Sequence, residues 1–250
     1  MKFEDVKKIG IVGGGVMGGG IAQVMAIGGY EVIVRDLTDE VIEATKGAIF
    51  DSRWGMKRSV EVGKLSFDDC ATAMARVNFT TNLQDLADVD MIIEAVPEKL
   101  EIKQQVFQEL DEVIKPEAIF ASNTSGFVIE EIAANVLESR KQLFAGMHFF
   151  NPVPAMKAVE IVSTSQTTQE TTETVTQVGA KAGKVTSQVG DKVGTYGFIV
   201  NRIFAAAGRE AQQLVDDGIA TEEEIDKMMI GGRNWPVGFF GQRGGIGQQW

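Results

Sequence analysis

The sequence predicts an α/β protein in which a doubly wound, mainly parallel sheet precedes a smaller, all-helical domain. Short apolar runs typical of strands alternate with segments of helical spacing through most of the chain, and this alternation is typical of parallel sheets. After Gly194 only helical spacing continues. We therefore expect one domain at residues 1–193 and a helical domain at residues 194–250.

The segment Lys8–Asp36 combines a strand, a glycine-rich turn, a helix and a second strand. Its successive parts are Ile9–Val12, Gly13–Gly18, Ile21–Ile27 and Tyr30–Val34. Such a unit of about 30 residues, ending in an acid, is the fingerprint of a Rossmann-like dinucleotide-binding domain.

Each part of this turn has a physical reason. Gly13 permits a tight turn with positive φ, Gly15 lets a pyrophosphate approach the backbone, and Gly18 lets helix and strand pack closely. The helix N-terminus then presents N–H groups to the phosphates. The Asp36 carboxylate would accept hydrogen bonds from both ribose hydroxyls and repel a 2′-phosphate, which favours NAD over NADP. The turn residues expected at the cofactor are Gly13, Gly15, Val16, Met17 and Gly18.

Two other interpretations compete for this segment. Residues 9–30 carry no charge and contain the GxxxG spacing of membrane helices, but their many glycines make the run poor in apolar side chains. An ordinary glycine-rich turn is the other alternative, and the complete βαβ context argues against it.

The bulk composition limits the class of partner. A formal net charge of -11 argues against nucleic acid or an anionic membrane as the main partner. A single cysteine, Cys70, cannot form an internal disulfide, which suits a reducing compartment. The N-terminus lacks the layout of a signal peptide. We expect a cytoplasmic protein that binds a small molecule and contains no metal site.

The rest of the chain continues the α/β pattern. The expected strands are Val77–Thr81, Met91–Val96, Ile119–Ser122, Phe144–Phe150, Val159–Val162 and one near Val185. The expected helices are Thr38–Phe50, Glu98–Ile114, Glu170–Ala182, Phe198–Val215 and one from Thr221 to about Ile230, which begins with the capping-box spacing of Thr221 and Glu224. The relative direction of the two strands joined by Asn151–Pro154 stays open.

A basic cluster interrupts this acidic chain. Arg53, Lys57, Arg58 and Lys64 place four positive charges within twelve residues. A solvated helix face explains such a run, and a phosphate-binding patch is the functional alternative.

The chain contains one histidine, His148, at the end of a β-type run. Histidine is the usual base for removing a proton from an alcohol near neutral pH. Glu160 lies in the next, otherwise apolar strand, where a buried carboxylate needs a partner. If the two strands are neighbours, Glu160 can orient the imidazole and stabilise its protonated form. A purely structural histidine with an edge-strand glutamate is the alternative.

Other polar groups follow strand ends. Ser122–Ser125 comes after an apolar strand, and ligands of open α/β sheets bind at the carboxyl ends of strands. Asn201 lies at the start of the helix after the domain boundary. Both motifs also suit plain helix capping.

Taken together, these motifs resemble the short-chain 3-hydroxyacyl-CoA dehydrogenase family, which includes 3-hydroxybutyryl-CoA dehydrogenases. The matching blocks, in order, are IGIVGGGVMGGGIAQ, EVIVRD, IIEAVPE, FASNTS, AGMHFFNPVPAMKAVEIV and GFIVNR. The spacing of HFFNPVP and the following VE is far more specific than the glycine turn.

The resemblance implies NAD-dependent oxidation of (3S)-3-hydroxyacyl-CoA to 3-oxoacyl-CoA, or the reverse, by a homodimer in fatty acid or butyrate metabolism. It implies that His148 is the general base, that Glu160 is its partner, and that Ser125 and Asn201 bind the substrate oxygen. The cofactor contacts that it implies are Asp36, Glu98, Lys103, Asn123 and Asn151. It places Lys57 and Lys64 at the phosphates of CoA.

The sequence departs from the family pattern at a few positions. Tyr196 replaces a proline, Gly126 replaces a serine, and the glycine- and glutamine-rich tail replaces a Gly-Pro-Phe pattern. The chain also stops at Trp250, where family members continue with helices, so we expect a shortened C-terminal domain. Two alternatives to the implied activity stay open: a hydroxy-acid dehydrogenase that needs no CoA, and a non-catalytic NAD-binding subunit.

Overall fold

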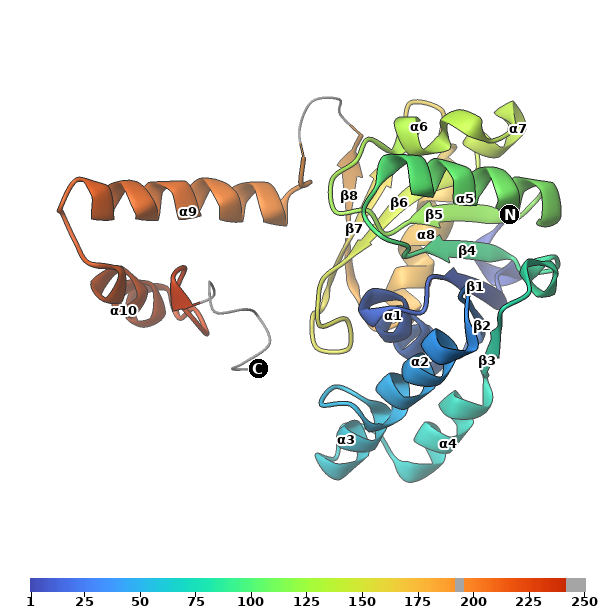
Figure 1. Ribbon diagram of the computed structural model, residues 1–250, viewed down its shortest axis with the longest axis horizontal. Helices are drawn as coiled ribbons and strands as arrows, with labels where there is room; N and C mark the ends of the chain where they lie inside the picture. Colours follow the sequence, from blue (N-terminus) through green and yellow to red (C-terminus); the bar gives the residue numbers. More distant parts are fainter. Residues whose placement is uncertain (192–195, 242–250) are drawn as a thin grey trace. The chain divides into compact units, whose positions relative to one another are not determined.

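Figure 1 shows the computed structural model of the chain, which describes residues 1–191 and 196–241. The chain divides into a first compact unit, Met1–Tyr196, and a second unit that begins at Gly197. The boundary expected between residues 193 and 194 lies outside the described residues, so it stays a prediction. The tail from residue 242 onward also lies outside them.

One sheet of eight strands forms the centre of the first unit, in the order β3-β2-β1-β4-β5-β6-β7-β8. The strands are β1 Lys8–Val12, β2 Glu31–Arg35, β3 Val77–Thr80, β4 Met91–Glu94, β5 Ile119–Ser122, β6 Phe144–Phe149, β7 Ala158–Ser163 and β8 Val185–Gly190. All neighbouring pairs are parallel except β6 and β7, which are antiparallel. The direction of the strands around Asn151–Pro154, left open by the sequence, is thereby determined.

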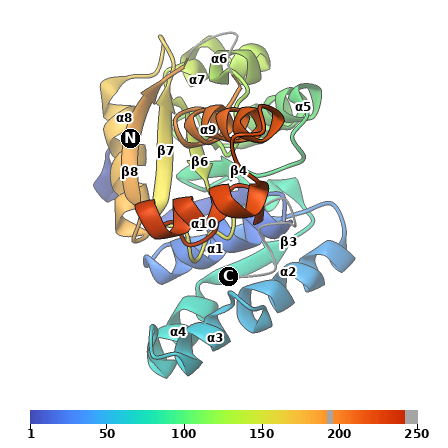
Figure 2. The ribbon, with the colours of Figure 1, turned by 90° about the vertical axis from the view of Figure 1, so that its left-hand side faces the viewer.

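Helices surround this sheet and form the second unit. They are α1 Val16–Ile27, α2 Asp39–Asp51, α3 Met56–Glu61, α4 Phe67–Ala75, α5 Leu100–Val113, α6 Ile129–Ile132, α7 Glu138–Lys141, α8 Gln169–Lys181, α9 Val200–Asp216 and α10 Glu222–Arg233. Short 3₁₀ helices occupy Phe3–Asp5, Leu83–Leu86 and Ala133–Asn135. Figures 1 and 2 both show α3 and α4 side by side beyond α2.

Successive side chains of each strand point to opposite faces of the sheet, and both faces are covered. On one face Ile11 and Ile93 share a buried core with Met25 of α1 and Val178 of α8. On the other face Phe107 of α5 contacts the rings of Phe120 and Phe144, at centroid distances of 5.5 and 4.5 Å. The near-continuous apolar strands of the sequence follow from this two-sided burial.

The second unit contains α9 and α10. Its small core consists of Ala211, Ile225, Phe239 and Phe240. The predicted capping box is present, since the Glu224 N–H donates to Thr221 Oγ1 and Glu224 Oε2 accepts from the Thr221 N–H. These features and the sheet of the first unit confirm the predicted fold class, a mainly parallel α/β domain with a helical second part.

Within the described ranges 1–191 and 196–241, no helix combines the length and apolar character that crossing a membrane requires. The apolar segment at residues 9–30 forms β1 and α1 of the sheet domain instead.

Candidate active site

The glycine turn between β1 and α1 has the geometry that a bound pyrophosphate requires. Gly13 has a φ of 99°, and a Cβ on Gly18 would overlap the Gly13 carbonyl oxygen. Gly15 is the N-cap of α1 without a side-chain hydrogen bond, and a Cβ there would meet nothing within 4 Å. The first-turn N–H groups of α1 therefore face open space beside Gly15, as phosphate binding at a helix N-terminus requires.

Asp36 is held at the end of β2 by two backbone groups. Its Oδ2 accepts from the Gly14 N–H at 2.5 Å, and its Oδ1 accepts from the Leu37 N–H at 2.6 Å. The Thr45 hydroxyl of α2 donates to the Gly14 carbonyl at 2.5 Å and so fixes the backbone of the turn. The carboxylate is thus fixed beside the glycine turn, where a ribose diol can reach it.

A cavity of about 630 Å³ joins the glycine turn to the ends of β4 and β5. Its apolar walls include Val16, which is 76% exposed, and Ile102. Its lining residues from the predicted site are Gly13, Gly15, Val16, Met17, Asp36, Glu98, Asn123 and Ser125. An apolar cleft with a few convergent polar groups at the carboxyl ends of parallel strands is the expected form of a dinucleotide site, and these residues fit NAD.

His148 and Glu160 face each other across the antiparallel pair. They are register partners on β6 and β7, and His148 Nδ1 lies 2.7 Å from Glu160 Oε2. Both side chains are buried, at 4% and 3% exposure. Because a carboxylate only accepts hydrogen bonds, Nδ1 carries the hydrogen, and the basic lone pair of the neutral imidazole lies on Nε2.

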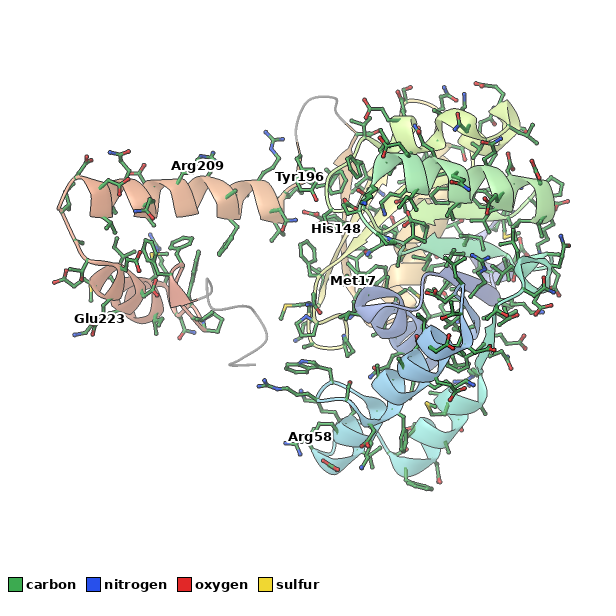
Figure 3. All side chains as sticks on the ribbon, in the orientation of Figure 1. Met17, Arg58, His148, Tyr196, Arg209 and Glu223 are labelled. Atoms are coloured by element: carbon green, nitrogen blue, oxygen red, sulfur yellow. The ribbon has the colours of Figure 1, made fainter. Side chains whose placement is uncertain are left out.

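The end of β6 is tied to the wall of the cavity. The Phe149 N–H, one residue after His148, donates to Asn123 Oδ1 at 2.8 Å. Asn123 lines the cavity together with Ser125, two residues further on. In Figure 3, the labelled residues Met17, His148 and Tyr196 follow one another along one edge of this unit.

Glu98 organises the turn that carries Ser125. Glu98 Oε1 accepts from the Thr124 hydroxyl at 2.7 Å and from the Ser125 N–H at 2.8 Å. The Tyr196 hydroxyl donates to the same oxygen at 3.4 Å. Glu98 therefore orders the backbone beside Ser125 from the cavity side.

Lys103 lies beneath this layer and does not line the cavity. Its side chain is 1% exposed, and its Nζ contacts Glu94 Oε1 at 2.7 Å and Glu98 Oε2 at 3.1 Å. Burial raises the pKa of the Glu94 carboxyl, while Lys103 acts in the opposite direction. In this structure Lys103 supports Glu98, so direct contact between Lys103 and the cofactor is the part of the predicted site that the geometry favours least.

Two further predicted site residues, Asn151 and Asn201, come from a loop and from the second unit. Asn151 is exposed, in the loop after β6. The residue Val153 of the same loop packs so closely on α1 that a Cβ on Gly20 would lie 2.9 Å from its Cβ. Asn201 lies in α9 of the second unit, and its role stays a prediction.

The basic cluster is partly neutralised. Lys57 Nζ contacts Asp51 at 2.6 Å, and Arg58 contacts Glu61 at 3.0 Å. Lys64 is exposed after α3. Among the described residues, no group of acids, histidines and cysteines is arranged to hold a metal ion.

Two contributors to this site were not predicted. Glu94 carries the same signal as Glu160, a carboxylate in an apolar strand, and its burial could have been expected on that ground. Tyr196 was recognised only as a departure from the family pattern. Its contact with Glu98 joins residues 98 positions apart, and no local sequence pattern reports such a contact.

Comparison with known proteins identifies the family. The sequence profile of the 3-hydroxyacyl-CoA dehydrogenase NAD-binding domain matches residues 8–192, and that of the C-terminal domain matches residues 197–249. The chain belongs to the 3-hydroxyacyl-CoA dehydrogenase family. It is an NAD-dependent oxidoreductase of this family, as predicted, and NAD is its cofactor.

Individual relatives agree with this assignment. A probable 3-hydroxybutyryl-CoA dehydrogenase of Deinococcus radiodurans is 42% identical over 231 residues, covering 92% of this chain and 80% of the relative. A 3-hydroxybutyryl-CoA dehydrogenase of Clostridioides difficile is 39% identical, with coverage of 92% and 79%. The crystal structure of the (S)-3-hydroxybutyryl-CoA dehydrogenase from Ralstonia eutropha superposes with a TM-score of 0.84 at 34% identity, covering 94% of this chain and 80% of that one.

Proposed function

We propose that this 3-hydroxyacyl-CoA dehydrogenase oxidises (3S)-3-hydroxyacyl-CoA to 3-oxoacyl-CoA, and catalyses the reverse reaction, through a His148–Glu160 base. The observation that carries this proposal is the buried 2.7 Å contact between the two side chains, directly in register on β6 and β7. The Asn123–Phe149 hydrogen bond ties the same strand end to the wall of the nucleotide cavity.

In the oxidation, His148 accepts the proton of the 3-hydroxyl on Nε2. Glu160 keeps the hydrogen on Nδ1 and stabilises the imidazolium that forms, which is worth more in a buried site than in water. When bound, NAD supplies the acceptor for the hydride that leaves C3. In the reverse direction the same imidazolium returns its proton to the 3-oxo group.

Hydrogen-bond donors would position the substrate oxygen. We assign this role to Ser125, on the turn ordered by Glu98, and to Asn201. We place Asn151 beside the base, because it follows His148 closely on the loop that leaves β6. Lys57 and Lys64 are assigned to the CoA phosphates. The Lys57–Asp51 contact is exposed, and exposed ion pairs exchange readily for a stronger anion.

The cofactor residues follow the cavity. The pyrophosphate would lie on the turn of Gly13, Gly15 and Gly18, with Val16 and Met17 at its side, and the ribose on Asp36. Glu98 and Asn123 would meet the nicotinamide end, and Lys103 would act there through Glu98. In this assignment residues 1–193 bind NAD, and residues 194–250 supply the helical substrate and dimerisation domain.

Two further features belong to this proposal. We infer a homodimer from the resemblance to the family, and size-exclusion chromatography with light scattering tests it. We also infer a cytoplasmic location. Cys70, the single cysteine, is buried as a free thiol, and proteins without disulfides are typical of reducing compartments such as the cytoplasm. Fractionation of cells that produce the protein tests the location.

An assay of the purified protein tests the activity. With NADH, the protein should reduce acetoacetyl-CoA and should not reduce free acetoacetate. The kcat/KM for NADH should exceed that for NADPH. Equal turnover of the free acid would instead support the CoA-independent hydroxy-acid dehydrogenase. Tight NADH binding without turnover of either substrate would support a non-catalytic subunit.

A further inference from the structure

Tyr196 brings an aromatic side chain to the polar end of the nucleotide cavity. Its hydroxyl lies 3.4 Å from Glu98 Oε1, and Glu98 lines the cavity. Its ring packs at 88° against the ring of Phe127, with 6.2 Å between the centroids. The residue is nevertheless 60% exposed, so most of its surface is open to a ligand.

The polar end of Tyr196 is fixed beside Ser125. The Ser125 N–H and the Tyr196 hydroxyl donate to the same oxygen, Glu98 Oε1. Burial and the nearby Glu98 raise the pKa of Tyr196 above its ordinary value. The hydroxyl is therefore protonated at neutral pH and keeps its contact with the carboxylate. This contact places the hydroxyl beside Ser125, and packing on Phe127 orients the ring.

Phe127 is fixed to the same turn. Its N–H donates to Thr124 Oγ1 at 3.1 Å, and Thr124 in turn donates to Glu98 at 2.7 Å. One carboxylate thus anchors Ser125 and both rings. The result is a hydroxyl group with an apolar wall immediately next to it, formed by the rings of Phe127 and Tyr196.

We propose that the Phe127–Tyr196 wall contacts the acyl tail of the substrate and that Tyr196 limits the length of that tail. The inference rests on the proposed function, in which Ser125 binds the oxygen on C3. The carbons beyond C3 begin one bond from the carbon that carries this oxygen, so they meet whatever surface borders Ser125. A polar group bordered by an apolar wall matches a 3-oxygenated carbon followed by a short alkyl chain.

In an apolar pocket, one methylene more or less changes discrimination by about 10- to 200-fold. Removing the ring should therefore change the preference between short and long acyl chains by at least about tenfold.

The test compares Tyr196→Ala with the matched control Tyr196→Phe, which retains the ring and loses the hydroxyl. The measured quantity is the ratio of kcat/KM for 3-oxooctanoyl-CoA to that for acetoacetyl-CoA, both with NADH. Tyr196→Ala should raise this ratio about tenfold or more. Tyr196→Phe should leave it within about twofold of wild type. Circular dichroism spectra and thermal unfolding curves like those of wild type verify that both variants fold.

The outcomes are distinct. An unchanged ratio in Tyr196→Ala would overturn the inference, and so would an equal shift in both variants, because the hydroxyl would then determine the preference. Phe127→Leu opens the same wall from its other side and should raise the ratio too, should Tyr196→Ala fail to fold. If the wild-type protein reduces neither substrate, the proposed function itself fails, whereas turnover with an unchanged ratio rejects only the acyl-tail wall.

Discussion

Replacement of Glu160 by glutamine removes a charge from the candidate base and leaves its shape unchanged. The glutamine carbonyl can still accept the hydrogen from His148 Nδ1, so the orientation of the imidazole is retained. The wild-type contact is 2.7 Å long between side chains that are 4% and 3% exposed. A hydrogen bond to a charged group contributes about 1.5–3 kcal/mol. If that amount stabilises the imidazolium in the transition state, kcat should fall about 10- to 150-fold.

The assay is acetoacetyl-CoA reduction and 3-hydroxybutyryl-CoA oxidation, followed by nicotinamide absorbance. Turnover should fall in both directions, because the imidazolium that forms in the oxidation is the proton donor of the reduction. NADH affinity should stay within about twofold of wild type, because Glu160 is not among the residues that line the cavity. A variant with wild-type kcat in both directions would refute the electrostatic role of Glu160.

Three further predictions concern the cofactor, the substrate and stability. Asp36→Ala should raise the KM for NADH by about tenfold or more and narrow the preference over NADPH, because it removes the carboxylate fixed by Gly14; equal KM values in variant and wild type would contradict this. The double variant Lys57→Ala/Lys64→Ala should raise the KM for acetoacetyl-CoA several-fold, because about two contacts to the CoA phosphates are lost, and it should leave NADH affinity unchanged. An unchanged KM would show that these lysines do not bind the phosphates of CoA. Burial lowers the pKa of Lys184 to about 8, so between pH 8 and 10.5 the unfolded chain binds more protons than the folded one, and the stability of the wild type should rise with pH there. In Lys184→Met the melting temperature should lack this rise. Equal dependence of the melting temperature on pH in variant and wild type would contradict the prediction.

The strand and helix pattern was predictable because the sheet is buried on both faces. The run Ile119–Ser122 is apolar up to its last residue, and its predicted bounds agree with those of β5. The helices α3 and α4 were not predicted as separate elements, because six and nine residues are too few for a clear helical period. For the basic run around α3, the sequence indicated only a solvated helix face. The antiparallel pairing of β6 and β7 was left open, because the sequence does not show that the two strands are neighbours. Once they are neighbours, the short loop of residues 150–157 favours the antiparallel direction.

Within the candidate site, residue types were predictable and their layering was not. We predicted that His148 and Glu160 pair, because burying a lone carboxylate is costly, and in the structure the two side chains are in contact. The contact of Lys103 with the cofactor stays a prediction. The sequence did not indicate that its side chain lies buried between Glu94 and Glu98, where its charge compensates the two carboxylates. The contact of Tyr196 with Glu98 depends on the path of the chain after β8, which no local pattern encodes.

The central claim is that His148 is the proton acceptor, and the most direct test is turnover of purified His148→Gln with acetoacetyl-CoA and NADH. We expect NADH binding within about twofold of wild type and a loss of turnover of about 100-fold or more, the usual contribution of a general acid–base group. Wild-type turnover in this variant, with normal NADH binding, would show that another group transfers the proton.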